Sequence, residues 1–433
     1  MGVLMATPVP ANPTATSQPI ASANSAGPMP APAKLSHPLT IPHFRNLWIG
    51  SAISLFGDQF YLVALPWLVL QLTGSSLALG TILMTAAVPR AVLMLAGGAM
   101  IDHFSPRRVL MATASARTLL VAAIAVLAWV NVIHLWHIYA LSLLFGVADA
   151  FSFPAGPALT PTLVAREQLP AASSALASTA HLIGMLGPAP AGLVVKAWGI
   201  AQALLLDAIS FLFVIAALWR IPERARAAAP AAKRPSMLHS IAEGLRYVVG
   251  DSALRSLIML MAALNFCVSG PVSVGLATMA KFRFASATAF GTLLSCFSGG
   301  ALAGMVLAGM VKRPPRRGLL LVGISFLMGF GLLAVGLSYH MAPIAITLAL
   351  MGVGAGFVNV QISAWMQGRV DRQVLGRVMS VLMFSAVGLL PISLLLAGLV
   401  AQAHLAAMFV ASGSLVLAVG TVAALTSGVR RIE

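Results

Sequence analysis

The chain has 433 residues, of which 59% are hydrophobic and only 8% are charged. A soluble globular protein carries about 25% charged residues, so this chain cannot cover its surface with groups that water solvates. Its 26 Lys and Arg against 10 Asp and Glu would suggest nucleic-acid binding in a soluble protein. Here the composition predicts a polytopic membrane protein.

Residues 1–40 are rich in Pro, Ala, Ser and Thr and hold no apolar block. Because such a segment cannot bury enough apolar surface to offset its loss of entropy, we expect a disordered tail. It also lacks the apolar core of a signal peptide, which runs for about 7–15 residues.

Twelve runs that follow are long and apolar enough to cross a bilayer, which takes about 20 residues in a helix. They are residues 46–72, 77–101, 109–132, 136–158, 170–197, 201–221, 254–279, 286–311, 318–338, 342–364, 377–401 and 405–427. Because the bilayer interior cannot satisfy the backbone of open strands, we predict an all-α fold of twelve transmembrane helices in two six-helix bundles.

The basic residues report the orientation of these helices. Of the 26 Lys and Arg, 21 fall in segments on one side, three on the other and two inside spans. Since Lys and Arg gather in cytoplasmic loops, both termini are expected in the cytoplasm. The basic excess then reflects topology, and no nucleic-acid partner is implied.

The longest connection, 222–253, separates residues 41–221 from 254–433. Met237, Leu238, Ile241 and Leu245 recur at helical spacing, which predicts an amphipathic helix on the cytoplasmic surface that clasps the two halves together. HFSPRRVLM after the second span and KRPPRRGLLL after the eighth share a double arginine. Paired halves of like orientation are typical of transporters whose site lies between the repeats near the midplane.

Four stretches resemble the major facilitator superfamily, and most closely its bacterial enterobactin exporters and macrolide or multidrug efflux proteins. They are FRNLWIGSAISLFGDQFYLVALPWLVLQLTGSS, GGAMIDHFSPRRVL, FSFPAGPALTPTLVAREQLPAASSAL with LGPAPAG after it, and LLLDAISFLFVIAALWRI. The resemblance spans residues 43–430. It implies a monomeric transporter of the bacterial inner membrane that moves small molecules by alternating access.

The resemblance also implies roles for two motifs. The first is a cytoplasmic gate motif, formed by Gly98, Asp102, Arg107 and Arg108, in which a carboxylate beside a basic pair is placed for a charge-assisted latch. The second is similar to the antiporter motif of the fifth helix and comprises Gly184, Gly187, Pro188 and Gly192. Small residues also let helices approach closely, so packing alone explains this motif equally well.

Five ionisable groups lie inside spans, where each costs a few kcal/mol to insert. Asp58, Arg90 and Asp149 lie near the midplane, and Arg117 is expected about two turns from the cytoplasmic face. Asp207 is expected within reach of water at the outer face, in a packing hydrogen bond.

The resemblance places Asp58 and Asp149 on cavity-lining helices, where a carboxylate can take up a proton on one side and release it on the other. Fixed ion pairs, Asp58 with Arg90 or Asp149 with Arg117, are the structural alternative.

We expect neutral polar side chains and one tyrosine to line a substrate cavity: Gln59, Tyr61, Asn265, Ser269, Asn359 and Gln361. None of the five lysines follows a glycine, so the phosphate-binding loop of ATPases is absent and ion coupling remains. The scattered histidines and the two cysteines in apolar runs indicate neither a metal site nor a catalytic group, and no cofactor is expected.

The leading hypothesis is therefore proton-coupled export, by antiport, of small amphipathic or hydrophobic molecules. Two alternatives stay open: a dedicated exporter of one siderophore or metabolite, and a lysophospholipid flippase without a proton relay.

Overall fold

The structure is a computed structural model that describes residues 2, 37–103, 105–222, 237–311 and 317–426. For residues 94–103, 237–242, 372, 373 and 386 it describes the backbone alone. The described chain is helical and contains no strand. The prediction of twelve apolar helices is confirmed, because twelve stretches of the described chain are long and apolar enough to cross a membrane.

The helices before the long connection are α1 Pro42–Thr73, α2 Ser76–His103, α3 Pro106–Trp129, α4 Leu135–Leu163, α5 Leu169–Leu186, α6 Pro188–Ala197 and α7 Ile200–Trp219. Those after it are α8 Met237–Gly250, α9 Ser252–Gly270, α10 Leu276–Phe282, α11 Ala287–Met310, α12 Arg317–Leu337, α13 Met341–Arg369, α14 Arg372–Gly388, α15 Leu390–Ala403 and α16 Leu405–Leu425. Short 3₁₀ turns lie at Pro38–Thr40 and Arg166–Gln168.

Three of the expected spans are broken. The fifth divides at Gly187 into α5 and α6, the seventh passes through a π-helical turn at Pro271–Gly275, and the eleventh divides at Leu389. Each break is followed by or begins at a proline, at position 188, 271 or 391. Proline has no backbone N–H to donate and clashes with the preceding turn, so it kinks a helix.

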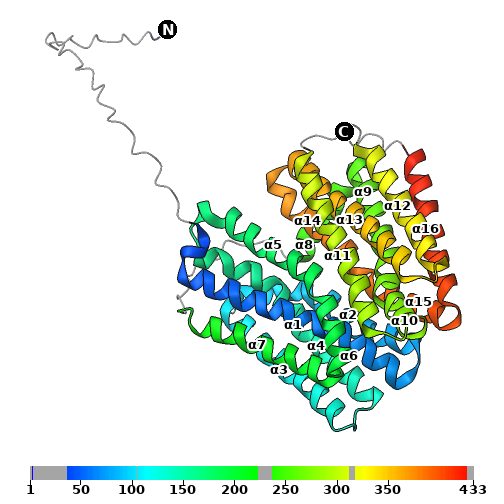
Figure 1. Ribbon diagram of the computed structural model, residues 1–433. Helices are drawn as coiled ribbons and strands as arrows, with labels where there is room; N and C mark the ends of the chain where they lie inside the picture. The colour runs from blue at the N-terminus through cyan, green and yellow to red at the C-terminus, as the bar shows by residue number, and fades with distance from the viewer. Residues whose placement is uncertain (1, 3–36, 104, 223–236, 312–316, 427–433) are drawn as a thin grey trace. The chain divides into compact units, whose positions relative to one another are not determined.

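Helices α1–α5 and α7 pack mainly on one another, and the carboxyl-terminal helices α9–α16 do the same among themselves. The exceptions are α6, which packs mainly on α11, and α15, which also packs closely on α2. In the first group α1 lies against α7, α2 against α4, and α3 against both α4 and α7 (Figure 1). In the second group α11 lies against α13, and α12 against α13 and α16. Because lipid tails are as apolar as these side chains, close van der Waals packing holds such helices together.

Contacts between the two groups gather at one end of the bundle. We call the end where α1 begins and α16 finishes the terminal end, and the opposite end the distal end. At the distal end, Oε1 of Gln402 accepts hydrogen bonds from Ser75 Oγ at 2.9 Å and from the Ser76 backbone N–H at 2.8 Å. A Cβ added at Gly80 would lie 2.5 Å from the carbonyl oxygen of Leu394, so α2 and α15 are in backbone contact there.

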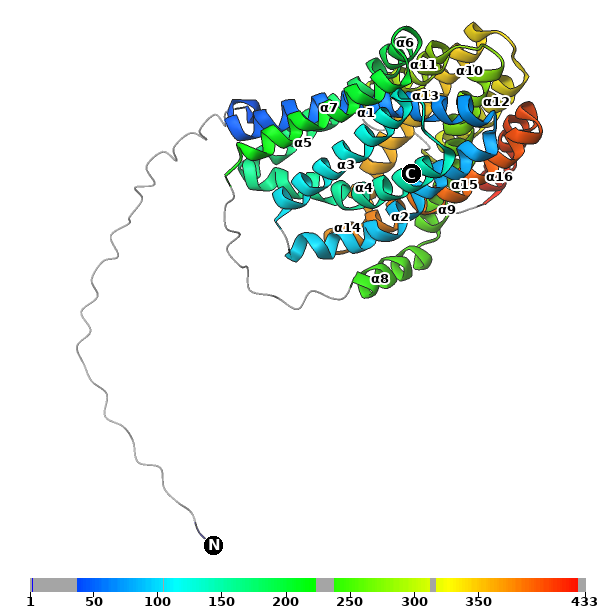
Figure 2. The same cartoon turned by 90° about the horizontal axis from the view of Figure 1, so that it is seen from below.

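The predicted amphipathic helix exists as α8 and packs mainly on α14 and α9, which are both carboxyl-terminal helices (Figure 2). Glu243 of α8 forms an ion pair with Arg377 of α14, and Val248 is buried against the same helices. Helix α8, which was expected to clasp the two halves together, therefore packs mainly on the carboxyl-terminal half. Residues 237–242, which carry part of the predicted apolar stripe, lie outside the described side chains.

Asp251 joins α8 to α9 as a helix cap. Its Oδ1 accepts hydrogen bonds from the backbone N–H groups of Ala253 at 2.8 Å and Leu254 at 3.3 Å, and its Oδ2 lies 3.1 Å from Nη2 of Arg369. Partial burial acts to raise the pKa of Asp251, but these N–H donors and the guanidinium outweigh it and hold the pKa below its ordinary value.

Candidate functional site

Among the described residues, two ion pairs lie within the amino-terminal helices, inside the predicted membrane spans. In the first, Nη2 of Arg117 on α3 lies 2.6 Å from Oδ1 of Asp58 on α1. The Arg117 guanidinium also stacks on the rings of Phe145 and Phe211, at 4.9 and 4.4 Å from their centroids. The side chain of Asp58 keeps 26% of its surface exposed, against 14% for Arg117, so the carboxylate is the part of the pair that a proton can reach.

The second pair joins α2 to α4, with Nη1 of Arg90 at 3.3 Å from Oδ2 of Asp149. The pairing expected from the sequence was therefore wrong, because each carboxylate binds the other arginine. Two features explain this. Helix α3 begins at Pro106, before the expected 109, which puts Arg117 about three turns inside the helix at the depth of Asp58. In addition, α2 packs closely on α4, and a sequence does not reveal which helices are neighbours.

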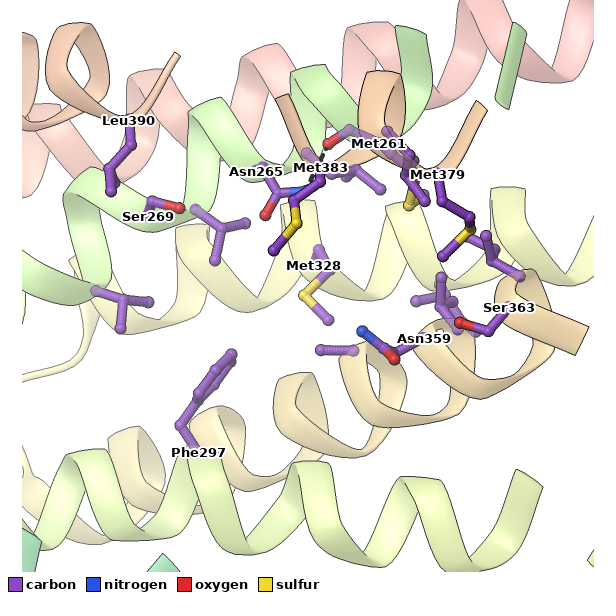
Figure 3. Close-up of a pocket in the computed structure, with 18 of the residues that line it drawn as sticks. Met261, Asn265, Ser269, Phe297, Met328, Asn359, Ser363, Met379, Met383 and Leu390 are labelled. Carbon is purple, nitrogen blue, oxygen red and sulfur yellow. Dashed lines mark hydrogen bonds between the residues drawn. The ribbon is translucent and has the colours of Figure 1, made fainter. Parts of the chain in front are cut away.

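A cavity of about 820 Å³ opens among the carboxyl-terminal helices. Figure 3 shows Asn265 on one wall, Phe297 on the opposite wall, and Met328 with Asn359 between them. Among the described residues that line this cavity, none is acidic, basic or histidine. Its surface is thus built from apolar side chains, several of them methionines, with a few neutral polar groups.

Three of the expected cavity residues, Asn265, Ser269 and Asn359, do line this space. The amide nitrogen of Asn265 donates to the carbonyl of Met261 in its own helix at 2.9 Å, and its carboxamide oxygen points toward the cavity (Figure 3). This geometry offers a bound molecule a hydrogen-bond acceptor on a mostly apolar wall.

The other three expected residues are elsewhere. Gln361 is 8% exposed and donates to the carbonyls of Ala308 and Val311 at 3.3 Å each. Two residues beyond Asn359 on a helix lie about 200° around its axis, so Gln361 faces away from the cavity. Gln59 bonds to its own helix, and Tyr61 stacks on Phe145 at 4.7 Å inside the amino-terminal bundle.

Sequence reasoning missed part of the cavity. Met328, Met379 and Met383 line it, and the 21 methionines of the chain were the available signal. A smaller adjoining cavity of about 270 Å³ shares Asn359 with the first and adds His181 of α5. This histidine stood alone in an apolar span, with no spacing to distinguish it.

The glycine–proline motif lies where the two groups of helices meet. Gly184 lines the smaller cavity, and a Cβ at Gly187 would lie 2.3 Å from Cγ of Gln59. A Cβ at Gly192 would lie 2.5 Å from the carbonyl oxygen of Ala287 on α11, and Pro188 is in similar backbone contact with α11. The motif therefore permits close approach of α5 and α6 to their neighbours.

The gate motif is described only in part. The side chains of Gly98 and Asp102 lie outside the described portion of the chain. Nε of Arg107 donates to the carbonyl of Leu218 at 2.8 Å, which ties the start of α3 to the end of α7. Arg108 follows in the first turn of α3, on the exposed side.

Metal ligands do not gather in the described part of the chain, which contains no group of three or more His, Cys, Asp or Glu side chains placed to hold an ion. The polar features within the described spans include the two ion pairs and the neutral cavity.

The chain is similar to known transporters over nearly its whole length. It is 25% identical to macrolide efflux protein A of Streptococcus pyogenes over 402 residues, which covers 90% of this chain and 97% of that protein. It is 28% identical over 408 residues to the multidrug efflux pump Tap of Mycolicibacterium fortuitum, covering 92% and 97%. A bacterial homologue of the iron transporter ferroportin, solved in an inward-facing state, superposes with a TM-score of 0.69 at 16% identity, covering 89% of this chain and 99% of that one.

A family model described as transmembrane secretion effector matches residues 34–433. The match covers more than half of the chain, and the twelve apolar helices agree with it. The protein is therefore a multi-pass membrane transporter rather than an enzyme, and it belongs to the transmembrane secretion effector family of the major facilitator superfamily.

Proposed function

We propose that this protein exports small hydrophobic or amphipathic molecules in exchange for protons. The observation that carries the proposal is that one protein contains both a cavity of about 820 Å³ lined by uncharged described residues and a partly exposed carboxylate–arginine pair at mid-span. The relatives named above are efflux pumps, which supports the export direction.

The cavity supports the substrate class. Methionine is flexible and polarizable and suits sites that accept varied apolar shapes, and neutral amides supply hydrogen bonds without charge. A drug-sized molecule occupies a pocket of about 300–1,000 Å³, which agrees with the cavity volume. A strongly anionic or cationic substrate would find no counter-charge on this wall, so we expect neutral or weakly basic molecules.

The Asp58–Arg117 pair supports proton coupling. A charged carboxylate in a span costs several kcal/mol unless it is paired, and Arg117 supplies that pairing here. When Asp58 takes up a proton, the Arg117 guanidinium keeps its charge but loses its anionic partner, so the hydrogen bond between the two side chains weakens. A proton therefore changes how α1 and α3 are held, as coupling to a conformational change requires.

Alternating access supplies the mechanism. The two groups of helices meet through close backbone contacts and hydrogen bonds at the distal end. Opening there requires these contacts to separate while a latch forms at the terminal end, where Asp102 and the arginines of the gate motif are located. The basic asymmetry of the loops supports a cytoplasmic terminal end in the bacterial inner membrane, and we expect a monomer to suffice.

The test is growth protection by the protein in an efflux-deficient host against a panel of neutral, cationic and anionic compounds, with and without a protonophore. We expect protection against neutral and weakly basic lipophilic compounds that the protonophore removes. Asn265→Leu should weaken it about tenfold for compounds that donate a hydrogen bond, since the lost bond is worth about 1–1.5 kcal/mol. Thr421→Val, on an exposed face with a hydroxyl bonded to its own helix, is the matched control.

Protection that is confined to anionic compounds, or that survives the protonophore unchanged, would contradict the proposal.

A further inference from the structure

Asp207 on α7 is a buried acidic side chain that belongs neither to the two ion pairs nor to the lining of the cavity. It is 0% exposed, and neither carboxylate oxygen has a hydrogen-bond partner among the described residues. The hydroxyl of Ser210 donates to the backbone carbonyl of Asp207 at 2.7 Å, and its oxygen lies near the carboxyl group. The sequence-based expectation of a water-accessible packing hydrogen bond was wrong, because α1 covers this face of α7.

Asp207 lies beside the Asp58–Arg117 pair. A Cβ added at Gly57, the residue before Asp58, would lie 3.0 Å from Oδ1 of Asp207. One turn further along α7, the ring of Phe211 lies 4.4 Å under the Arg117 guanidinium. Arg117 consequently interacts electrostatically with both carboxylates.

Arg117 also retains a donor that this arrangement does not use. Its Nη2 reaches Asp58, but its Nε is buried without a partner among the described residues. Arginine remains charged and presents five N–H donors in a fixed fork. One cluster thus contains a buried acceptor group without a donor and a buried donor without an acceptor.

An isolated buried carboxylate is so costly that such a group exists in its neutral form. We propose that Asp207 carries a proton in this conformation and is the second, alternating partner of Arg117 in a proton relay. The proposal rests on the proposed function for its role in transport but not for its charge state.

The relay has one step within the cluster. The proton leaves a carboxyl oxygen of Asp207 and arrives on a carboxylate oxygen of Asp58, while the Arg117 guanidinium moves from Asp58 to Asp207. One O–H bond breaks, one forms, and the net charge of the three groups is unchanged. Asp58 then releases its proton into the water of the open side. Asp207, about two turns from the distal start of α7, takes up a proton when that end opens.

The groups that face this exchange are few in the described structure. Helix α1 contributes Asp58 and Tyr61, and α3 contributes Arg117. Helix α4 adds Asp149, which is bound to Arg90, and α6 carries Lys196 only in its last turn. The other charges therefore leave Asp58 and Asp207 to compete for one arginine.

Infrared spectroscopy of the purified full-length protein tests this directly, because a neutral carboxyl group has its own C=O band. Isotope-labelled aspartate identifies the band as aspartic. We expect one such band, at the frequency of a buried carboxyl group, in the wild type and its loss in Asp207→Asn. We also expect its loss in Asp58→Asn, since Arg117 then binds the ionised Asp207. Asp251→Asn, which removes an ionised carboxylate outside the spans, is the matched control and should retain the band.

A wild type without the band, or a band that persists in Asp58→Asn, overturns the relay. The spectra require no transport, so they separate failure of the relay from failure of the proposed export. In proteoliposomes, Asp207→Asn should bind substrate and exchange it downhill but lose proton-driven accumulation. Normal proton-driven accumulation by Asp207→Asn would also overturn the relay. If Asp58→Asn fails to fold, the accumulation measured with Asp207→Asn decides by itself.

Discussion

The contact between α2 and α15 at the distal end predicts that one methyl group will shift the conformational balance. In Gly80→Ala the new Cβ would lie 2.5 Å from the carbonyl oxygen of Leu394 and 2.9 Å from the Cα of Gly398. Ordinary contact begins at 3.4 Å, so the two backbones must separate by about 0.9 Å. Neither neighbour is a flexible side chain that can rotate away.

Overpacking of this kind costs about 1–3 kcal/mol. This free-energy cost destabilises the conformation in which the distal end is closed, and it is absent when that end opens. The ratio of distally open to distally closed molecules should therefore rise by roughly 5- to 150-fold. Glycine-to-alanine exchange also favours a helix by up to about 1 kcal/mol, but this gain applies to both conformations and cancels.

Double electron–electron resonance measures the shift. Spin labels at Val132 and His340, exposed residues in the distal loops of the two groups of helices, should show a longer distance population in Gly80→Ala. The matched control is Gly309→Ala, where an added Cβ meets nothing within 4 Å, and it should leave the distribution unchanged. An unchanged distribution in folded Gly80→Ala would refute the argument that this contact closes the distal end.

Two further predictions concern the terminal end. Asp102→Asn should remove the latch carboxylate and shift the same spin-label distances toward the distally closed form without unfolding the protein; an unchanged distribution would count against the latch. Asp251 has a lowered pKa, so its stabilising contribution is present above the ordinary aspartate pKa of about 3.9 and is lost as pH falls through the lowered value. Asp251→Ala should cost about 1 kcal/mol of local stability, seen as faster amide hydrogen exchange at the start of α9 at pH 7, with the difference from wild type disappearing in acid.

The fold was predictable because its main determinant is local. A run of about 20 apolar residues specifies a transmembrane helix whatever its neighbours are, and the positions of Lys and Arg specify an orientation. The breaks at prolines 188, 271 and 391 carried a local signal as well. For these reasons the twelve helices agree with the sequence-based prediction to within a few residues at most ends.

The site was predictable only in part, because it depends on which helices are neighbours. Asn265, Ser269 and Asn359 were chosen for their polarity alone, and they line the cavity. Gln361 was misplaced because polarity does not report which face of a helix meets the cavity. The partners of Asp58 were misassigned because a sequence gives depth but not the packing of α3 beside α1, and Asp207 was misjudged for the same reason.

Substrate-induced proton release from detergent-solubilised protein decides whether Asp58 couples proton movement to transport. The amide in Asp58→Asn resembles the protonated carboxyl, so this variant should fold, bind substrate and exchange it downhill. Asp251→Asn, a carboxylate outside the spans, is the control and should release protons as the wild type does. We expect substrate to trigger proton release from the wild type and none from Asp58→Asn. Undiminished release from Asp58→Asn would show that another group carries the coupling proton.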